Sequence, residues 1–478
     1  MKSMFAAGLT TAIGPRFVSA GDTSRRPPNV VLIFTDDLGY GDLGCYGAED
    51  IPTPRIDQMA SEGLKLTDFY VAAPVCTPAR ASLLTGCYPQ RVGMPGVVHP
   101  HDNRGLNPDE MTLGDMFQVQ GYRTACFGKW HLGHHEPHRP PNHGFDESLY
   151  TPYSHDMYRG APWGGNWTEN PDWPEYVPVL RDHEEVDQLH GLDDFSTMTR
   201  LFTEATVDFI RQSEDNPFFA YLPHPMPHLE LKPPERWEGV SQRGPYGDVV
   251  AELDWSTGKI LDTLKELGIE DNTLVVFTSD NGPAVQYQRP RFEGGCAGPL
   301  RGRKNTPYEG GFRVPCVLRW PGVIPAGSVS SEVVTAMDFL PTFAGMLEAG
   351  LPDHPIDGHD MMPLLQQPKQ AQSPYDAFYY YRERRLRGVR SDEWKLMAAR
   401  PEYNNDGELV VEHDAKLFNL QEDIGESTDL AEQHPQKVEE LEGRVQQMRE
   451  QLGDHIPNHP GPQPYPATQA RPALNLSE

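Results

Sequence analysis

The chain alternates between continuous apolar runs and segments in which apolar residues recur every three or four positions. Four segments of largely apolar character predict β-strands: residues 29–37, 123–130, 217–224 and 272–282. Three periodic segments predict amphipathic helices: residues 53–64, 195–213 and 246–268. Strands that alternate with helices predict an α/β sandwich around a large, mostly parallel central sheet. In such a sheet, functional groups gather at the carboxyl ends of the strands.

The pattern changes after about residue 365. Residues 377–399 and 413–420 resemble antiparallel strands, and residues 434–452 form a helical pattern that precedes a Pro-rich tail. We therefore expect three parts. Residues 1–26 are an N-terminal segment, residues 27–365 the main α/β domain, and residues 366–478 a smaller α+β subdomain with a small antiparallel sheet and a helix.

The N-terminal segment "MKSMFAAGLTTAIGPRFVSAGD" resembles the later half of a twin-arginine export signal. It has one lysine, a short apolar run and a "VSA" suited to signal peptidase, although Arg16 interrupts it. The run is too short to span a bilayer. We expect a periplasmic or secreted protein, and a disordered extension is the alternative.

The composition restricts the function classes. Asp and Glu number 69 among 478 residues and Lys and Arg number 41, which gives a net charge of −28. A chain this acidic is poorly suited to nucleic acid or an anionic membrane, so an anionic substrate needs a local basic pocket. The six cysteines include no CxxC pair, so the sequence predicts neither a zinc ribbon nor a disulfide scaffold.

Two of the apolar runs end in the same way. "VVLIFTDD" ends in Asp36 and Asp37, and "LVVFTSDN" ends in Asp280 and Asn281. If these ends meet at one edge of the sheet, they offer four oxygen ligands, which favour Ca²⁺, or Mg²⁺ as the alternative, over zinc. Either pair taken alone is also typical of an ordinary turn or helix cap.

The stretch "PVCTPARASLLTG", residues 74–86, places a cysteine where a loop enters a helix. Pro78 suits the first helical turn, so Cys76 lies at a helix N-terminus, where free N–H groups favour an anionic nucleophile or substrate. By itself Cys76 fits equally well as a small buried apolar residue, which is the role expected of Cys45, Cys126 and Cys316.

"CTPAR" followed by "LLTG" resembles the signature of the sulfatase family, in which the cysteine of C-x-P-x-R is converted to formylglycine (3-oxoalanine). Ala79 stands where the family usually has Ser, while Cys76, Pro78 and Arg80 match. The resemblance covers nearly the whole chain and is closest to arylsulfatase A and N-acetylgalactosamine-6-sulfatase. It implies an alkaline-phosphatase-like fold and a formylglycine-generating, or sulfatase-maturing, enzyme as a partner.

Further motifs match the family in the same order along the chain. "GKWHLG" supplies Lys129 and His131, and "GGCAGPLRGRKNTPYEGG" places Lys304 at the active-site lysine. In "LPHPMPHLEL", His228 matches the catalytic histidine best. The proline that often follows this histidine in the family is absent after His228, so His224 stays open as a second candidate. The resemblance also implies a set of metal ligands: Asp36, Asp37, Asp280, Asn281 and the modified Cys76.

These residues imply a sulfuric ester hydrolase for a sulfated small molecule or oligosaccharide. One hydroxyl of hydrated formylglycine attacks sulfur with Asp37 as its base, and three cations, Arg80, Lys129 and Lys304, balance the anions. His228, with Lys304, assists the leaving oxygen. His131 takes a proton from the second hydroxyl, so that sulfate leaves.

The sequence leaves two other functions open. The same metal and nucleophile suit a phosphate or phosphonate monoester hydrolase. If Cys76 is not modified, the protein would instead bind sulfated glycans without catalysis. We expect substrate specificity to lie in residues 92–105, residues 154–177 and the C-terminal subdomain. Three tryptophans of the second loop suggest a sugar-stacking wall, although aromatic residues in long loops more often pack the loop itself: Trp163, Trp167 and Trp173.

Overall fold

The computed structural model describes residues 26–161, 169, 171–213, 215–284, 294–403, 409–454 and 474–475. The predicted export segment, Trp163 and Trp167 lie outside these residues. No helix within the described part of the chain is long and apolar enough to cross a membrane.

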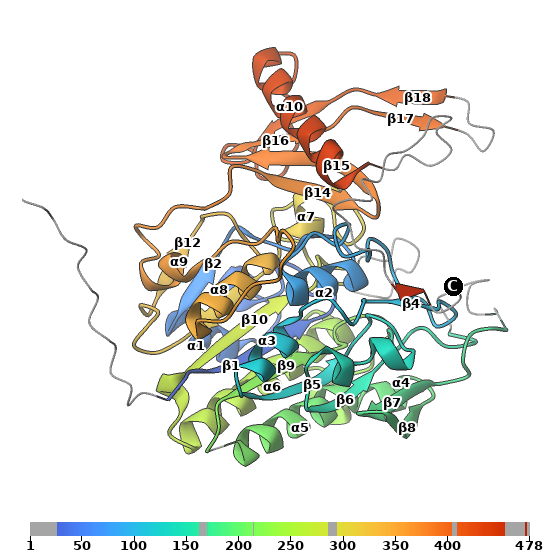
Figure 1. Ribbon diagram of the computed structural model, residues 1–478, viewed down its shortest axis with the longest axis vertical. Coiled ribbons are helices and arrows are strands. Elements are labelled where there is room, and N and C mark those ends of the chain that lie inside the picture. Colours follow the sequence, from blue (N-terminus) through green and yellow to red (C-terminus); the bar gives the residue numbers. More distant parts are fainter. Residues whose placement is uncertain are drawn as a thin grey trace, which may run out of the picture.

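A ten-stranded sheet forms the centre of the molecule (Figure 1). Its order is β12 (Ser328–Ser330), β2 (Leu64–Leu66), β11 (Cys316–Arg319), β10 (Thr273–Ser279), β1 (Asn29–Thr35), β9 (Phe218–Pro223), β5 (Arg123–Lys129), β6 (Glu147–Thr151), β7 (Val177–Arg181) and β8 (Glu184–Leu189). The central strands β10, β1, β9, β5 and β6 are parallel. The four apolar runs are strands of this sheet, which confirms the predicted fold class.

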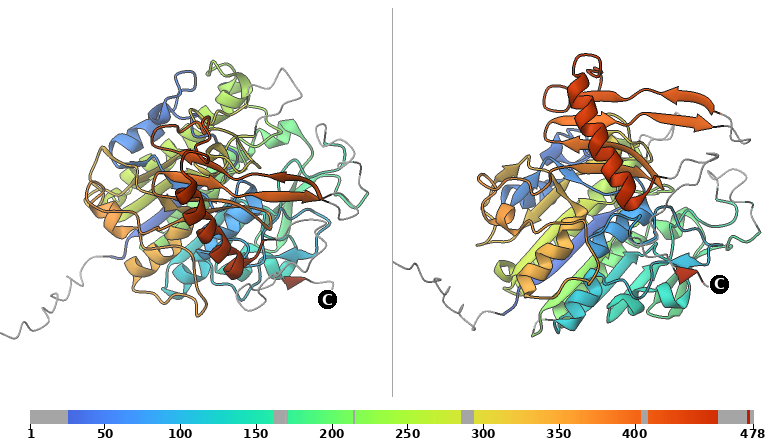
Figure 2. Two further views of the ribbon diagram at one scale, coloured as in Figure 1. Left: turned by 90° about the horizontal axis from the view of Figure 1, so that it is seen from above. Right: turned by 45° about the horizontal axis from the view of Figure 1, so that its top comes forward.

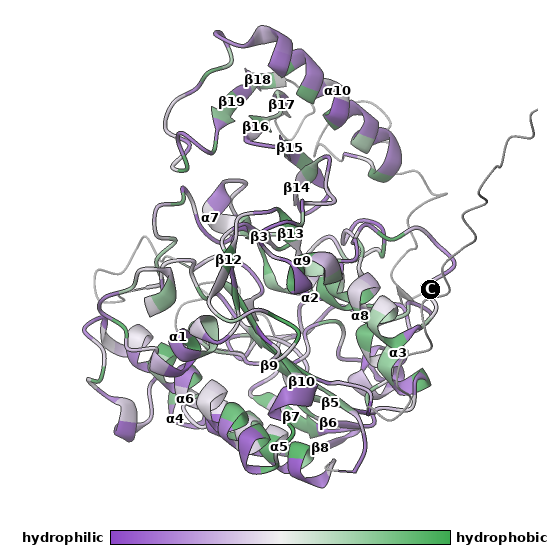
Figure 3. Cartoon of the chain, turned by 90° about the vertical axis from the view of Figure 1, so that its left-hand side faces the viewer, coloured by the Kyte–Doolittle hydropathy of each residue, from purple (hydrophilic) through white to green (hydrophobic). Residues whose placement is uncertain are grey.

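Helices cover both faces of this sheet. Val30, Leu32 and Phe34 of β1 pack toward three helices, α2 (Cys76–Thr85), α3 (Leu113–Val119) and α8 (Phe339–Leu347). Val31 and Ile33 of the same strand pack toward α1 (Pro54–Ser61), α5 (Met198–Gln212) and α6 (Gly244–Glu266). Burial on both faces explains why β1 is apolar at consecutive positions from Val30 to Phe34 rather than at every second one. Figure 3 shows the same layering, with hydrophobic strands between helices whose outer faces are hydrophilic.

Short elements complete the main body. They are α4 (Leu192–Phe195), α7 (Glu309–Phe312), α9 (Met362–Gln366), the pair β3 (Phe69–Tyr70) and β13 (Val334–Thr335), and the pair β4 (Arg104–Gly105) and β20 (Leu474–Asn475).

A second, four-stranded antiparallel sheet lies beyond α7 (Figures 1 and 2). It consists of β14 (Phe378–Arg382), β15 (Arg385–Ser391), β16 (Trp394–Met397) and β19 (Lys416–Asn419). The helix α10 (Pro435–Leu452) packs against it, and the hairpin of β17 (Arg400–Tyr403) and β18 (Leu409–His413) extends from it. The predicted antiparallel strands and C-terminal helix are therefore present.

Apolar and charged groups join the two sheets. Tyr70 and Phe312 of the main body share a buried cluster with Phe378 of β14. Lys395 of β16 is fully buried and forms ion pairs with Glu309 of α7 at 2.9 Å and with Glu426 at 2.8 Å. A buried cation between two carboxylates holds the second sheet to the main body through electrostatics as well as packing.

Candidate active site

The four predicted metal ligands lie together at the carboxyl edge of the large sheet. Thr35 of β1 pairs with Ser279 of β10, so the residues that follow these strands are neighbours. The Asp37 backbone N–H donates to Asp280 Oδ1 at 3.1 Å, and Asn281 Nδ2 donates to Asp37 Oδ1 at 2.7 Å. All four side chains are buried, and Asp37 has a positive φ of 65°, a conformation that is strained for a residue other than glycine.

A close approach of two loops fixes the segment after β10. A Cβ added to Gly282 would lie 1.7 Å from the carbonyl oxygen of Gly310, so only glycine fits there. Gly310 belongs to α7, and Lys304 lies in the loop that leads into α7. This approach brings the loop of Lys304 to the acidic residues.

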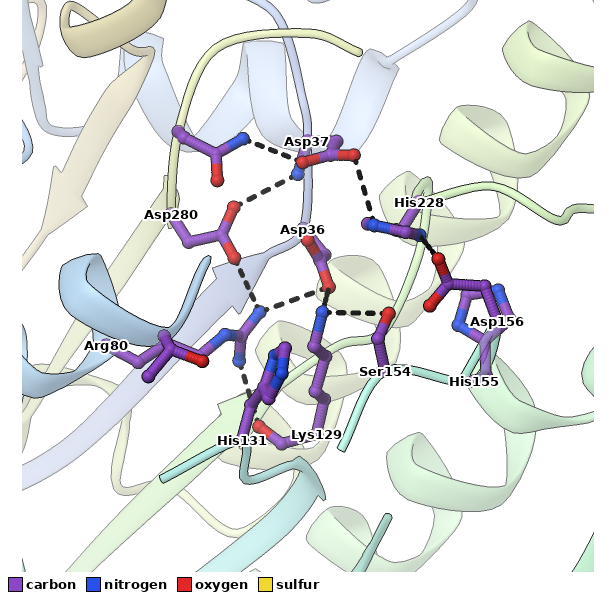
Figure 4. A network of polar contacts seen from close by, with 12 residues as sticks. Asp36, Asp37, Arg80, Lys129, His131, Ser154, His155, Asp156, His228 and Asp280 are labelled. Carbon is purple, nitrogen blue, oxygen red and sulfur yellow. Dashed lines mark hydrogen bonds and ion pairs between the residues drawn. The ribbon is translucent and has the colours of Figure 1, made fainter. Parts of the chain in front are cut away.

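Three cations surround these acidic residues, and Figure 4 shows two of them, Arg80 and Lys129. Arg80 of α2 lies 2.8 Å from Asp280 and 3.4 Å from Asp36, and Lys129 at the end of β5 contacts Asp36. Lys304 Nζ donates to Asp37 at 2.8 Å. Arg80 and Lys129 are fully buried, so these contacts form where little solvent screens them. The site thus gathers three cations beside three carboxylates within an acidic chain.

Burial and the surrounding charges act in opposite directions on the carboxylates. Burial raises the pKa of Asp36, but the charges of Lys129, His228, Arg80 and Lys304 outweigh it and hold that pKa well below its usual range. Burial raises the pKa of Asp37 and Asp280 above its usual range despite the cations beside them. Cations therefore keep Asp36 ionised, whereas Asp37 and Asp280 carry an electrostatic cost that a bound cation would relieve.

The oxygens of this group fit a divalent metal. Asp36 Oδ1 and Asn281 Oδ1 are buried and have no hydrogen-bond partner among the described residues. One ligand atom each of Asp36, Asp37 and His228 lie within 4.8 Å of one another. Buried oxygens without a donor are costly in a folded protein, and a hard cation such as Ca²⁺ or Mg²⁺ is a partner that would satisfy them.

Cys76 is the first residue of α2, as the sequence predicts, and its side chain is buried. Burial raises the pKa of its thiol, while the charges of Lys129 and Lys304 act in the opposite direction and those of Asp36 and Asp280 add to the rise. These influences place Cys76 beside the charged cluster. A thiol with a raised pKa is a poor nucleophile, so the environment does not activate an unmodified cysteine.

His131 lies two residues beyond Lys129, is fully buried, and has a positive φ of 59°. Its Nε2 lies 2.9 Å from the carbonyl oxygen of Val98. A carbonyl only accepts, so Nε2 carries the proton and Nδ1 keeps a lone pair, for which no partner exists among the described residues. Burial and the charges of Lys129 and Arg80 hold the pKa of His131 well below its usual value. His131 is thus a neutral imidazole with one free acceptor nitrogen.

The structure separates the two histidines that follow β9. His228 Nε2 lies 3.6 Å from Asp37, and His228 Nδ1 lies 4.0 Å from Asp156. His224 is turned toward α6, where its Nε2 lies 2.9 Å from Ser256 Oγ. The structure therefore brings His228, and not His224, to the acidic group.

Sequence reasoning did not single out two polar residues of this cluster. Lys129 Nζ donates to Ser154 Oγ at 3.1 Å, and the neighbouring Asp156 faces His228 (Figure 4). Both lie just after β6, whose residue Thr151 pairs with Lys129. The signal was a run of polar residues, "SHD", directly after a strand, but β6 itself was not predicted.

Trp173, predicted for a sugar-stacking wall, is 6% exposed. Its ring stacks on His99, and its Nε1 donates to His101 Nδ1 at 3.0 Å. Trp173 therefore packs its own loop against residues 99–101 rather than offering an open aromatic face.

Comparisons with known proteins match most of the chain. A family model described as Sulfatase matches residues 28–349, and one described as N-sulphoglucosamine sulphohydrolase, C-terminal, matches residues 303–453. Arylsulfatase A of Homo sapiens is 36% identical over 449 residues, or 86% of this chain and 85% of that protein. N-acetylgalactosamine-6-sulfatase of Rattus norvegicus is 37% identical over 390 residues, or 77% of this chain and 71% of that protein. The crystal structure of Ps i-CgsB in complex with k-i-k-neocarrahexaose matches with a TM-score of 0.75 and 28% identity, over 88% of this chain and 93% of that chain.

Proposed function

The chain belongs to the sulfatase family and is a sulfuric ester hydrolase, and we propose that it cleaves sulfate monoesters of aryl or carbohydrate alcohols through a modified Cys76 and a divalent metal. One observation carries this proposal. Cys76 begins a helix beside three cations and four buried oxygen-bearing side chains, all at one edge of the sheet. The cations of this arrangement can bind a sulfate group, and its buried oxygens can ligate a metal ion.

We propose that Asp36, Asp37, Asp280, Asn281 and the modified Cys76 hold Ca²⁺, with Mg²⁺ as the alternative. When bound, the metal supplies positive charge to the sulfate oxygens and lowers the pKa of a hydroxyl that it ligates. The two oxygens without hydrogen bonds, Asp36 Oδ1 and Asn281 Oδ1, support this ligand set.

We further propose that a formylglycine-generating or sulfatase-maturing enzyme converts Cys76 to formylglycine. The hydrated aldehyde supplies two hydroxyls on one carbon, one for attack on sulfur and one for the later release of sulfate. The raised pKa of the unmodified thiol supports this assignment, because burial weakens a cysteine nucleophile at this position.

The remaining residues divide between charge balance and proton transfer. Arg80, Lys129 and Lys304 offset the charge of the sulfate oxygens, and they are held in place by Asp280, Asp36 and Asp37. His228 faces the side of Asp37 and assists the leaving oxygen. His131 accepts a proton at Nδ1 when sulfate is released. We assign no catalytic role to His224, whose Nε2 is engaged with Ser256.

We propose sulfated carbohydrates as the substrates, since a relative with 28% identity binds a neocarrahexaose. We also propose that residues 27–365 form the catalytic unit, that residues 366–478 contribute to substrate choice, and that the protein acts in the periplasm or outside the cell. A periplasmic or extracellular location suits an enzyme that acts on sulfated oligosaccharides.

The function is tested by comparing an aryl sulfate with the aryl phosphate of the same phenol. A sulfatase is expected to show a larger kcat/KM for the sulfate, because the site balances the single charge of a sulfate ester. A larger kcat/KM for the phosphate would identify a phosphate or phosphonate monoester hydrolase instead. Binding of sulfated glycan without turnover of either ester would identify a binding protein.

Replacing His131 with alanine is expected to slow the release of sulfate more than the first release of phenol. Loss of a proton-transfer group lowers a rate by about 10²–10⁴-fold. A stopped-flow trace should therefore show about one phenol released per enzyme and then slow turnover. The exposed His183 serves as the control, and His183→Ala should keep the parent trace. Steady turnover of His131→Ala at the parent rate would remove His131 from this role.

A further inference from the structure

An arginine cluster lies on the second sheet, next to the loop that carries Lys304. The cluster consists of Arg382 at the end of β14, Arg385 and Arg387 on β15, and Arg400 on β17. Arg382 Nε donates to Asn305 Oδ1 at 2.7 Å, and Asn305 directly follows Lys304. Arg382 therefore connects the cluster in the C-terminal subdomain to the loop that carries Lys304.

Arg387 is the unusual member of this cluster. The residue is only 7% exposed, and its Nε is buried without a hydrogen-bond partner among the described residues. In the described part of the chain, its guanidinium makes no hydrogen bond or ion pair. Buried charges in proteins are ordinarily paired, so a buried arginine whose guanidinium has no partner among the described residues can still bind an anion.

The charges around Arg387 make its buried positive charge still less favourable. Burial and the positive charges of Arg400, Arg382 and Arg385 together lower the pKa of Arg387 to about 10, while Asp454 acts in the opposite direction. Asp454 is already engaged, because its carboxylate accepts from the Leu386 backbone N–H at 3.1 Å and from Arg449 Nε at 2.8 Å. Four neighbouring cations in a chain of net charge −28 form a local positive field that attracts anions.

We propose that Arg387, with Arg382, Arg385 and Arg400, binds a second sulfate or carboxylate group of the same oligosaccharide whose sulfate ester enters the active site. This inference rests on the proposed function, because it assumes a sulfated substrate. Guanidinium groups donate paired hydrogen bonds to sulfate and carboxylate oxygens, and a bound anion would neutralise the repulsion within the cluster. The chemical class of the substrate is then a polyanionic glycan rather than a simple aryl or steryl sulfate.

Direct binding tests this subsite apart from catalysis. Fluorescently labelled hexasaccharides of heparin, chondroitin sulfate and carrageenan are titrated into the Cys76→Ala protein, which cannot turn them over. Arg387→Gln in that background is expected to raise the Kd of the hexasaccharide that binds best by about tenfold or more, since hydrogen bonds to charged groups contribute about 1.5–3 kcal/mol. Arg200→Gln, a change of an exposed arginine on α5, should leave the Kd within about twofold of the parent value.

Stability provides the second readout. Because Arg387 is unpaired, Arg387→Gln should unfold at the same or a higher temperature than the parent when no glycan is present. The same hexasaccharide should raise the unfolding temperature of the parent more than that of Arg387→Gln. A marked loss of stability in Arg387→Gln without glycan would show that the arginine has a structural partner and would overturn the proposal.

The outcomes separate the subsite from the proposed function. Equal Kd values for the parent and Arg387→Gln, equal losses in Arg387→Gln and Arg200→Gln, or no binding of any hexasaccharide would each overturn the subsite. Turnover of an aryl sulfate by protein with intact Cys76 tests the sulfatase function independently of these results. Binding that depends on Arg387 in a protein without sulfatase activity would support the subsite and contradict the proposed hydrolysis.

Discussion

Cys76→Ser is expected to lower the steady-state kcat for an aryl sulfate by about 10³-fold or more, in line with the loss of other enzymatic nucleophiles. Serine places one hydroxyl at the start of α2, close to Lys129, Lys304 and Asp36. It cannot form an aldehyde hydrate, so the second hydroxyl that releases sulfate is missing. The variant should release at most about one phenol per enzyme and retain sulfate, which intact-protein mass spectrometry would detect.

Cys296→Ser is the matched control for this experiment, because Cys296 is an exposed free cysteine outside the charged cluster. It should keep the parent kcat. If Cys76→Ser keeps the parent kcat as well, residue 76 is not the nucleophile and the assignment of the cluster as a catalytic centre is wrong.

Lys395→Met is expected to lower the free energy of unfolding by about 3–5 kcal/mol, the usual cost of removing one partner from a buried ion pair. Lys395 is fully buried between Glu309 and Glu426, and its ammonium group lies 3.9 Å from the centre of the Tyr380 ring. Methionine fills much of the same volume but removes the cation shared by Glu309 and Glu426, and Glu309 keeps the longer ion pair with Arg313 at 3.7 Å. Urea unfolding followed by tryptophan fluorescence measures the change.

Lys437→Met provides the comparison, because Lys437 forms a partly exposed pair with Glu440 on the surface of α10. Such surface pairs contribute about 0–1 kcal/mol, so this variant should unfold close to the parent. Equal unfolding free energies for Lys395→Met and the parent would show that the Glu309–Lys395–Glu426 group does not hold the second sheet.

The sequence was sufficient to predict the centre of the fold. β1 and β10 contain continuous apolar runs, residues 30–34 and 274–277, because helices cover both faces of the sheet, and such runs are typical of buried parallel strands. Parallel neighbours end at the same edge, and this geometry brings Asp36 and Asp37 to Asp280 and Asn281 although 243 residues separate Asp37 from Asp280. Cys76, at the start of a helix, follows from Pro78 and the apolar residues after it.

Other parts of the site depend on contacts that periodicity does not encode. β6 is short and mixed in character, so Ser154 and Asp156 after it were not tied to Lys129. His224 and His228 lie four residues apart after one strand, and only packing against Ser256 of α6 turns His224 away. The partners of Glu309 lie 86 and 117 residues further along the chain, and charge alone does not say which cations and anions meet.

The measurement that tests the central claim most directly is the mass of the tryptic peptide that contains residue 76, taken from protein whose aryl sulfatase activity has been determined. The account predicts that active protein carries formylglycine at this position, so that the peptide has the mass of an aldehyde in place of a thiol and reacts with an aldehyde-specific hydrazide. The fraction modified should rise in proportion to kcat per chain across preparations. Fully active protein in which residue 76 is entirely unmodified cysteine would contradict the account.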